Sequence, residues 1–597
     1  MNITLKHYFC CSNETNNWIY FGTNFIKLKK LEQKIGKNKK ISLDGKINNI
    51  GDNQKENFID WIENQRNYFK DSTEWLMNNL ASKDNRSSKI FLNICQLISI
   101  NKYLEDHEDK NNEKITIISE NFHLIQFLKD NLNKKHNVKS PIGLLLFSFF
   151  EKGFFFVKGL FNYIKIIIFF LENYLFAKLS KTKPSVAPSG EIFLFHDLTK
   201  STDFDNSVTQ GQIYGGFSHW LSSKKKKIVT LPWFYKDLNN KRKLYKNLRQ
   251  RDSFIPEDWL NIYDYCNSLV VSFKSAFSIN EKIEYPELNI STIIQAEKIL
   301  NLSNKSAIYL RYIPALKKWG KNLTSFTCFD NYQNQLFEQP IRIFAKSSNI
   351  KTKSIGFYPT LHSKRFLAYH SVADEWNSKS KPDIIACSNN FSKNVLNSQG
   401  IPEKRIKVIS DLQRENFQNH SFEKKFNKNL LLVLSLFPET NSEMLTKISN
   451  INDYLVNDLG LKITVRPHPY HKKKDVLKDL NWNKLPIGWV WSEDNFVSEL
   501  NNSYCIVTMF SSSAIDAILS NNILVVLKSE LNIGENFLDT LEEQFPVLKT
   551  TSEKELRNKM TEIFKSNIDF YKNEFTKIKN KISLNINKDN YNELLNK

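Results

Sequence analysis

Two short polar segments in the last third of the chain combine residue types that bind phosphate. Arg466-Pro467-His468-Pro469 follows an apolar stretch at 461–465, and Ser511-Ser512-Ser513 follows another at 504–508. Hydroxyl groups at the start of a helix lie beside free backbone N–H groups and the positive end of the helix dipole, which together can bind a phosphate. His468 can donate a hydrogen bond to the same phosphate and offset charge on a leaving nucleotide. The predicted nucleotide-binding residues are therefore Arg466, His468, Ser511, Ser512 and Ser513.

Each segment also has a simpler interpretation. A serine before a helix is often only its N-cap, and a His-Pro pair at the end of a strand can be a rigid turn. The phosphate-binding hypothesis rests on finding both segments in this order on neighbouring strand–helix units.

A transfer reaction also needs a group that accepts the proton of the attacking hydroxyl, and a carboxylate or histidine can do this. Asp197 follows the apolar run at 191–195 and is the candidate we favour. Glu338, His362 and Glu120 are the other candidates. An acidic residue after a strand can equally be a turn former or a helix cap.

The elements that must position these residues form two series of alternating strands and helices. Short apolar runs bounded by polar turns are typical of buried parallel strands. They occur first at 114–119, then at 191–195, 227–231, 325–329, 353–357, 383–386 and 405–409, and again at 430–434, 461–465, 488–491, 504–508 and 523–527. We predict an α/β fold with an N-terminal acceptor-side domain at 1–414 and a C-terminal nucleotide-binding domain at 415–597. A cleft would lie between the carboxyl ends of their strands.

The segment 141–180 is unusually rich in phenylalanine. Its charges at Glu151, Lys158, Lys165 and Glu172 are spaced by seven residues, so on a helix they form one narrow stripe. The longest apolar run, 142–150, is shorter than the roughly 20 residues that span a bilayer. We predict helical structure lying on a membrane surface, with its apolar side in the lipid and its charged side in water. A helix pair packed against the N-terminal domain is the alternative.

Composition narrows the possible partners. The 84 Lys and Arg residues exceed the 63 Asp and Glu residues, giving a net charge of +21, which favours an anionic partner. No nucleic-acid-binding motif is present, so we expect no nucleic acid partner. Seven scattered cysteines without a CxxC pair indicate neither a zinc site nor a disulfide framework. The N-terminal sequence lacks the pattern of a secretory signal, so we expect a cytoplasmic protein.

Two further charged motifs are interpreted as solvated surface. Asp203-Phe204-Asp205 matches the DxD of metal-dependent glycosyltransferases, but no nucleotide-binding strand precedes it, and we expect no metal site. Lys472-Lys473-Lys474 follows the His468 turn and could assist an anionic donor only weakly.

The Arg466–Pro469 turn and the Ser511–Ser513 loop resemble the HP and serine motifs of bacterial sialyltransferase-like and Kdo-transferase-like glycosyltransferases of the GT-B type. The chain also resembles bacterial surface carbohydrate biosynthesis proteins at 331–338, 354–363 and 382–386. This resemblance implies a GT-B-like fold of two Rossmann-like domains, with the matching residues holding the phosphate of a CMP-sugar. The acidic Asp/Glu-Asp/Glu-Gly triplet that supplies the base in many sialyltransferases is not found. CDP-glycerol and CDP-ribitol phosphotransferases carry similar motifs, so the donor class stays open.

We therefore expect a glycosyltransferase on the inner face of the cell membrane. It would move a sugar, such as Kdo or a nonulosonic acid, from a CMP-activated donor to a lipid-linked saccharide. No cofactor or metal is expected. The alternatives are a CDP-polyol phosphotransferase, whose product contains new phosphodiesters, and a non-catalytic scaffold, which binds no nucleotide.

Overall fold

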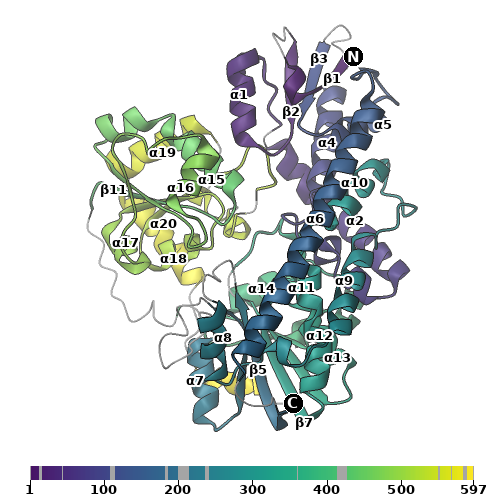
Figure 1. Cartoon of the computed structure of the whole chain (residues 1–597). Coiled ribbons are helices and arrows are strands. Elements are labelled where there is room, and N and C mark those ends of the chain that lie inside the picture. The colour runs from purple at the N-terminus through teal and green to yellow at the C-terminus, as the bar shows by residue number, and fades with distance from the viewer. Residues whose placement is uncertain are drawn as a thin grey trace.

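The computed structural model contains three parallel β-sheets, each with helices around it (Figure 1). It describes residues 2–11, 16–43, 45–107, 114–181, 186–199, 214–234, 241–358, 361–412, 414, 426–534, 536–542, 544–548, 552–565, 568–582 and 588–595. Every pairing between the described strands is parallel. The predicted α/β class is confirmed, and the range 1–414 contains two sheets.

The first unit, residues 2–139, was not predicted as a separate sheet. Its strands pair in the order β2-β3-β1-β4. They are β1 (Asn2–His7), β2 (Asn17–Phe21), β3 (Lys114–Ser119) and β4 (Asn137–Lys139). Its helices are α1 (Phe25–Ile35), α2 (Lys46–Phe69), α3 (Thr73–Leu76), α4 (Ile90–Glu105) and α5 (Phe122–Leu132). Apolar side chains of α2 and α4 pack on the buried faces of β1 and β3.

The middle unit is built on a six-stranded sheet in the order β10-β9-β8-β7-β5-β6. The strands are β5 (Ser189–Thr199), β6 (Ile228–Phe234), β7 (Asn322–Asn331), β8 (Lys351–Phe357), β9 (Ile384–Cys387) and β10 (Ile406–Val408). The helices are α7 (Gly215–Ser223), α8 (Lys241–Arg249), α9 (Ile262–Ala276), α10 (Ser291–Asn301), α11 (Ser306–Leu310), α12 (Tyr312–Trp319), α13 (Gln339–Ser347) and α14 (Asn390–Ser398). Helix α10 packs against α5, and thereby joins this segment to the first unit.

The C-terminal unit has a five-stranded sheet in the order β13-β12-β11-β14-β15. The strands are β11 (Asn429–Val433), β12 (Lys462–Arg466), β13 (Trp489–Trp491), β14 (Cys505–Thr508) and β15 (Ile523–Val526). The helices are α15 (Pro438–Ser449), α16 (Lys473–Leu480), α17 (Phe496–Asn502), α18 (Ser513–Leu519), α19 (Glu553–Lys565) and α20 (Ile568–Lys581). The chain then returns to the middle unit, where Tyr591 and Leu594, at the last helix α21 (Asn592–Leu595), pack beside Phe217.

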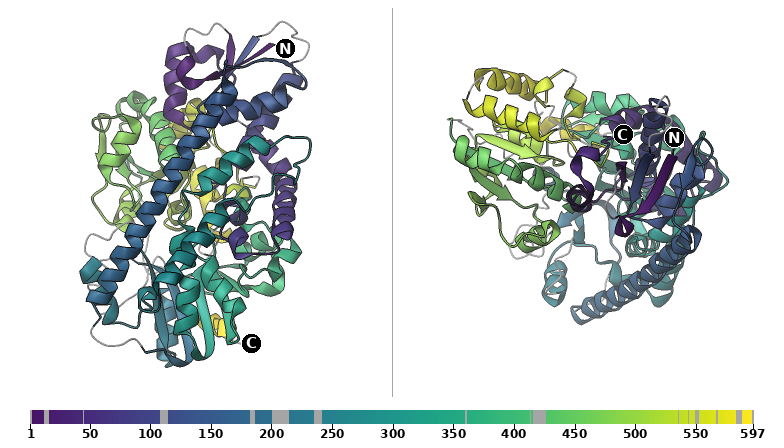
Figure 2. Two further views of the ribbon diagram at one scale, coloured as in Figure 1. Left: turned by 45° about the vertical axis from the view of Figure 1, so that its right-hand side comes forward. Right: turned by 90° about the horizontal axis from the view of Figure 1, so that it is seen from above.

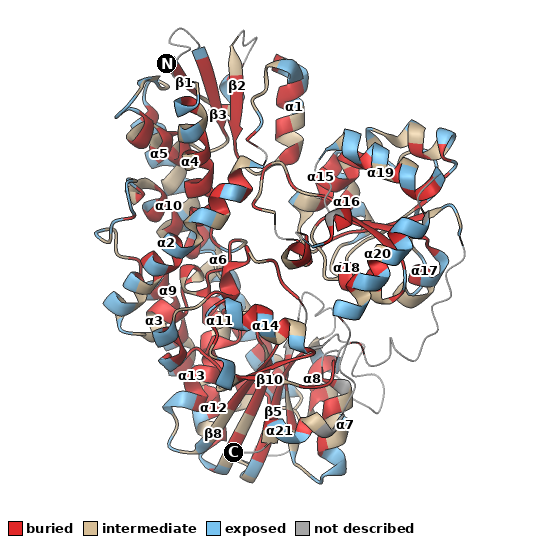
Figure 3. Ribbon diagram, turned by 180° about the vertical axis from the view of Figure 1, so that it is seen from behind, coloured by how far each residue is buried: buried red, intermediate tan, exposed pale blue. Residues whose placement is uncertain are grey.

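All three units meet at one junction. The guanidinium of Arg365, which follows β8, donates to both carboxylate oxygens of Asp52 in α2 at 2.9 Å and to the carbonyl of Gly534 at 3.3 Å. The N–H of Gly534 in turn donates to Asn48 at 2.7 Å. The carboxyl ends of the middle and C-terminal sheets approach here, since Lys364 donates its N–H to Asp539 at 2.8 Å. Seen from behind, the buried residues concentrate in the three sheets and the helix faces that cover them (Figure 3).

The phenylalanine-rich segment is a single helix, α6 (Leu144–Leu179), of 36 residues and about 54 Å. It runs diagonally over one face of the molecule, from the first unit to the middle unit (Figure 2). From Gly159 to Ala177 its buried residues recur every three to seven positions and pack on the body of the protein. Phe149, Phe150, Phe154 and Phe161 are exposed. The charged stripe of α6 was predicted to face water. In the structure Glu151 contacts His123 and Glu172 contacts Lys241, so these two charges border the side of α6 that packs on the protein.

Helix α6 is long and apolar enough to cross a membrane by length and composition, with a mean hydropathy of 1.9 over its most apolar window, of which 17% is buried. The uninterrupted apolar run 142–150 is too short for a span, whereas the whole helix is long enough. The packing of α6 along the protein body leaves one side of the helix exposed.

Candidate functional site

The His468 turn and the serine loop lie at the same edge of the C-terminal sheet. His468 follows β12 and Ser511 follows β14, and both strands pair in parallel with β11 between them. The two segments are therefore separated by about two strand spacings, roughly 10 Å. The sequence predicted this placement, because carboxyl ends of parallel strands share one sheet edge.

His468 is held in a defined tautomer. Its Nδ1 accepts a hydrogen bond from the backbone N–H of Tyr470 at 3.3 Å, which leaves the proton of the neutral ring on Nε2. Burial, with a smaller contribution from nearby His471, lowers the pKa of His468 to about 4. The ring is therefore neutral at pH 7 and can donate one hydrogen bond through Nε2.

His471 extends the site, although no sequence motif marked it. Its Nε2 donates to the carbonyl of Leu436 at 2.8 Å, and so joins the loop after β12 to the loop after β11. That second loop leads through Phe437 to Pro438, the first residue of the 12-residue helix α15.

The serine loop forms the start of helix α18. Ser511 Oγ accepts the N–H of Ser513 at 3.3 Å, and Ser512 is the N-cap residue. All three serines are partly buried. Asp516 in the same helix accepts from the buried Arg414 at 2.6 Å, which fixes α18 against the segment that follows the middle sheet.

Arg466 has another role. Its Nη1 donates to Ser492 Oγ at 2.9 Å and to the carbonyl of Asp494 at 2.8 Å, and lies 3.3 Å from the Glu499 carboxylate. The guanidinium also lies over the ring of Phe496. Arg466 therefore holds the loop between β13 and α17.

A pocket of about 350 Å³ lies between the first and C-terminal units. The C-terminal unit contributes Phe437 and Glu439 from the start of α15, and Phe510 from the serine loop. The first unit contributes Arg86 and Lys89. We call this cavity the junction pocket. Its described lining residues include two cations and one carboxylate, and Arg86 is itself paired with Asp84 at 2.6 Å. Lys89 is exposed and adds positive charge at the rim of the pocket.

Aromatic rings surround the junction pocket. The rings of Phe437 and Phe510 are 5.1 Å apart, and Phe510 and Phe537 are 5.3 Å apart. The guanidinium of Arg86 lies 4.2 Å from the centre of Phe366 and 5.4 Å from that of Phe437. Flat, apolar faces beside cations suit the base and phosphates of a nucleotide.

Three of the four predicted proton acceptors lie on separate elements of the middle unit, and none of these three is among the described residues that line the junction pocket. Asp197 lies near the carboxyl end of β5, opposite Pro232 of β6. His362 is buried among Phe366, Tyr369 and Phe537, at the contact with the C-terminal unit.

Glu338 is part of a buried ion-pair cluster. It lies 2.8 Å from Arg342, which also binds Asp330, and it accepts the N–H of Gln333 at 2.9 Å. Burial raises the pKa of Glu338 to about 8. With its carboxylate fully enclosed, Glu338 supports the start of α13.

The other acidic candidates are Glu120 and the Asp203–Asp205 motif. Glu120 bonds to Tyr20, Asn24 and Lys27 within the first unit. Asp203-Phe204-Asp205 lies outside the described residues. Among the residues that the structure describes, no group of three His, Cys, Asp or Glu side chains could hold a metal ion.

No family model and no curated protein matches the sequence. Several solved structures are similar in backbone. S. aureus MnaA with UDP has 10% identity, a TM-score of 0.39, and coverage of 68% of this chain and 95% of that chain. The glycotransferase of kitacinnamycin has 9% identity, a TM-score of 0.37, and coverage of 68% and 96%. UDP-GlcNAc 2-epimerase from Neisseria meningitidis, bound to UDP-GlcNAc, has 11% identity, a TM-score of 0.36, and coverage of 68% and 98%. At these TM-scores the function of this chain has to be argued from its own residues.

Proposed function

We propose that the chain is a glycosyltransferase that moves a sugar from a CMP-activated donor to a membrane-linked saccharide of a bacterial surface polysaccharide. An acidic keto sugar such as Kdo or a nonulosonic acid is the sugar class we favour. The observation that carries the proposal is the position of the His468 turn and the serine loop at one sheet edge, beside the junction pocket.

In this proposal the phosphate of CMP lies between His468 and the serine loop. The Nε2–H of His468 donates to a phosphate oxygen, and the hydroxyls of Ser511, Ser512 and Ser513 supply further donors. The cytosine stacks against the rings of the junction pocket, with Arg86 and Lys89 adding positive charge. These groups neutralise the leaving CMP without a metal ion.

The reaction we propose is an inverting displacement. The acceptor hydroxyl loses its proton to a carboxylate while its oxygen bonds to the anomeric carbon, and the bond from that carbon to the phosphate oxygen breaks. Asp197 is the base we favour, because it is at the carboxyl edge of the middle sheet. His362, at the contact with the C-terminal unit, is the second candidate.

The exposed face of α6 supports a peripheral position on the cytoplasmic side of the membrane. Phenylalanines that are about two-thirds exposed, such as Phe149 at 70% and Phe154 at 66%, carry a large free-energy cost in water. An interfacial helix removes this cost, and lysines at its border attract anionic lipids. A lipid-linked acceptor would be concentrated at the same surface.

A transfer assay tests the function. Purified protein incubated with CMP-Kdo and a lipid-linked saccharide should release CMP and add the sugar without new phosphorus in the product. New phosphodiesters formed from a CDP-polyol would instead identify a phosphotransferase. Release of CMP from neither donor class, together with no binding of any nucleotide, would identify a scaffold.

A further inference from the structure

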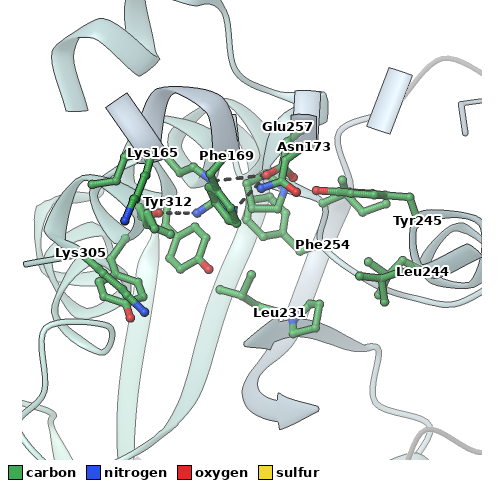
Figure 4. Close-up of a pocket in the computed structure, with 18 of the residues that line it drawn as sticks. Lys165, Phe169, Asn173, Leu231, Leu244, Tyr245, Phe254, Glu257, Lys305 and Tyr312 are labelled. Atoms are coloured by element: carbon green, nitrogen blue, oxygen red, sulfur yellow. Dashed lines mark hydrogen bonds and ion pairs between the residues drawn. The ribbon is translucent and has the colours of Figure 1, made fainter. Parts of the chain in front are cut away.

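A second pocket, of about 380 Å³, lies between α6 and the middle unit (Figure 4). We call it the α6 pocket. One wall is α6 itself, through Ile166, Phe169 and Asn173. The facing wall is formed by Leu231 and Pro232 of β6 and by Leu244 and Tyr245 of α8.

The residues that line the α6 pocket carry more positive than negative charge. Deep inside, Arg311 lies 3.0 Å from Glu257, and both side chains are buried, so these two charges offset each other. Lys165 and Lys305 also line the pocket, and both are exposed. Neither lysine has an ion-pair partner among the described residues. Figure 4 shows the two lysines at the same end of the pocket, away from Leu231 and Leu244. That end can therefore bind one anionic group.

A shallower hollow of about 300 Å³ continues outward from the lysine end. Phe154, Val157, Lys158 and Phe161 of α6 line it, and it shares Asn162 and Lys165 with the α6 pocket. The side chain of Asn162 donates to the carbonyl of Asn304 at 3.2 Å, which fixes the boundary between the two hollows. A path lined by three apolar side chains, with Lys158 beside them, therefore leads from the exposed face of α6 to Lys165.

The opposite end of the pocket approaches the predicted proton acceptor. Pro232, which lines the pocket, lies opposite Asp197 in the parallel pairing of β6 with β5. Paired residues on neighbouring strands are roughly 5 Å apart. The Asp197 side chain itself belongs to the other face of the sheet, with Phe195 and Tyr214, because side chains alternate along β5. The α6 pocket therefore reaches edge strand β6 on the face that carries Leu194 and Leu231.

The apolar face is two helices wide. Helix α9 exposes Tyr263, Val270, Phe273 and Phe277, which recur at helical spacing along one side. Its Phe273 ring lies 6.1 Å from the ring of Tyr163 in α6. The mouth of the outer hollow thus adjoins a broad apolar surface, which suits lipid and not an aqueous anion.

We propose that the α6 pocket binds a saccharide carried on a lipid phosphate, with its phosphate between Lys165 and Lys305. The lipid chain occupies the outer hollow and continues into the membrane. The saccharide occupies the inner pocket, where Tyr245 and Tyr312 offer ring faces and Asn173 a polar group. This assignment rests on the proposed function for the identity of the ligand as acceptor. The binding of a lipid phosphate can be tested without any transfer reaction.

The test measures binding of farnesyl phosphate, a short lipid phosphate, by calorimetry. The variant Lys165→Ala/Lys305→Ala should lose at least tenfold in affinity. The control Lys178→Ala/Lys317→Ala removes the same charge from exposed lysines outside the pocket, and should change affinity less than twofold. Farnesol lacks the phosphate, so both variants should bind it with the same affinity. Equal binding of farnesyl phosphate by both variants would overturn the proposal.

Two further experiments distinguish a lipid phosphate from a membrane phospholipid and locate the bound lipid on the protein. A short-chain phosphatidylglycerol should fail to displace farnesyl phosphate, and displacement at equal concentration would reassign the pocket to membrane phospholipid. A diazirine-bearing farnesyl phosphate should label α6 near residues 154–169, and labelling confined to other segments would contradict the assignment. Failure to bind CMP would refute the donor site while leaving the lipid-phosphate result intact.

Discussion

The backbone N–H of Tyr470 donates to Nδ1 of His468 across 3.3 Å, and this contact places the proton of the neutral imidazole on Nε2. A ring whose pKa is lowered to about 4 by burial stays neutral through the physiological range. His468 is therefore a fixed neutral donor at the edge of the C-terminal sheet, next to the proposed phosphate.

We predict that His468→Ala lowers kcat by about 10² or more, because it removes a donor to charge that grows on the phosphate. The turn is partly exposed, so the variant should fold. His468→Gln should recover part of the loss, since its amide can donate in the same direction. Steady-state rates with saturating CMP-sugar give the answer, and near-normal turnover of the Ala variant would reduce His468 to a turn residue.

The proton acceptor can be identified by comparing two carboxylates of the middle unit. Asp197→Asn should lower kcat by about 10² or more while CMP affinity is kept, because general base catalysis contributes that much. Glu338→Gln should instead change mainly the free energy of unfolding, since Glu338 belongs to the enclosed cluster with Arg342. Full activity of Asp197→Asn would transfer the role to another group, with His362 tested next.

Parts of this site could be predicted from sequence and parts could not. Strands β11 and β14 are short apolar runs and β12 alternates apolar with polar residues, and their order along the chain was enough to place His468 and Ser511 on one edge. Arg86 and Lys89 come from a polar loop in the first unit, far away in sequence, and no local pattern marks them. The partner of Arg466, Glu499, likewise lies 33 positions away, so its bridging role was not visible.

Some elements of the fold could likewise be predicted from the sequence and others could not. Several strands of the middle and C-terminal units, such as β11, β14 and β15, are buried on both faces and form short apolar runs. Strand β1 alternates buried and partly exposed residues and pairs with β3 about a hundred residues later, so it was missed. For α6 the seven-residue charge spacing predicted a stripe correctly. The side of the molecule that this stripe faces is set by its contacts with His123 and Lys241, which belong to other elements.

Buried histidines predict a loss of stability in acid. Burial lowers the pKa of His370, whose Nε2 donates to the carbonyl of Lys364 at 2.8 Å, to about 3. The unfolded chain binds a proton near pH 6.5, and the folded state does not until far lower pH. Unfolding is therefore favoured as pH falls below about 6.5, by about 2 kcal/mol for this residue between pH 7 and pH 5.

Urea denaturation at the two pH values measures this effect. His370→Gln, which can still donate to the carbonyl, should make the change in free energy of unfolding between pH 7 and pH 5 smaller by about 2 kcal/mol. His196, whose pKa burial also lowers to about 3, should continue to act in that variant. An unchanged difference between the two pH values would show that His370 takes up a proton equally in both states.

Membrane attachment is predicted to depend on the outer face of α6. Phe150, Phe154 and Phe161 are exposed by 62%, 66% and 59%, so replacing all three by Asp should leave the fold intact. Each charge placed in the apolar boundary costs roughly a few kcal/mol, and the variant should no longer sediment with anionic liposomes. High salt should weaken attachment of the wild type only in part, because it screens the lysines and not the apolar contact.

The control for this experiment is Ile487→Asp, a change at a residue that is 84% exposed on the C-terminal unit. It should sediment like the wild type. Retention of the triple variant on liposomes would show that α6 does not form the membrane surface.

Calorimetry with CMP, CDP, UDP and GDP tests the central claim most directly. We predict that CMP and CDP bind more tightly than UDP and GDP, and that replacing Ser511, Ser512 and Ser513 together by Ala weakens CMP binding by tenfold or more while the fold is retained. Failure of the wild type to bind a cytidine nucleotide in preference to the others, or unchanged CMP affinity in the triple variant, would contradict the proposed donor site.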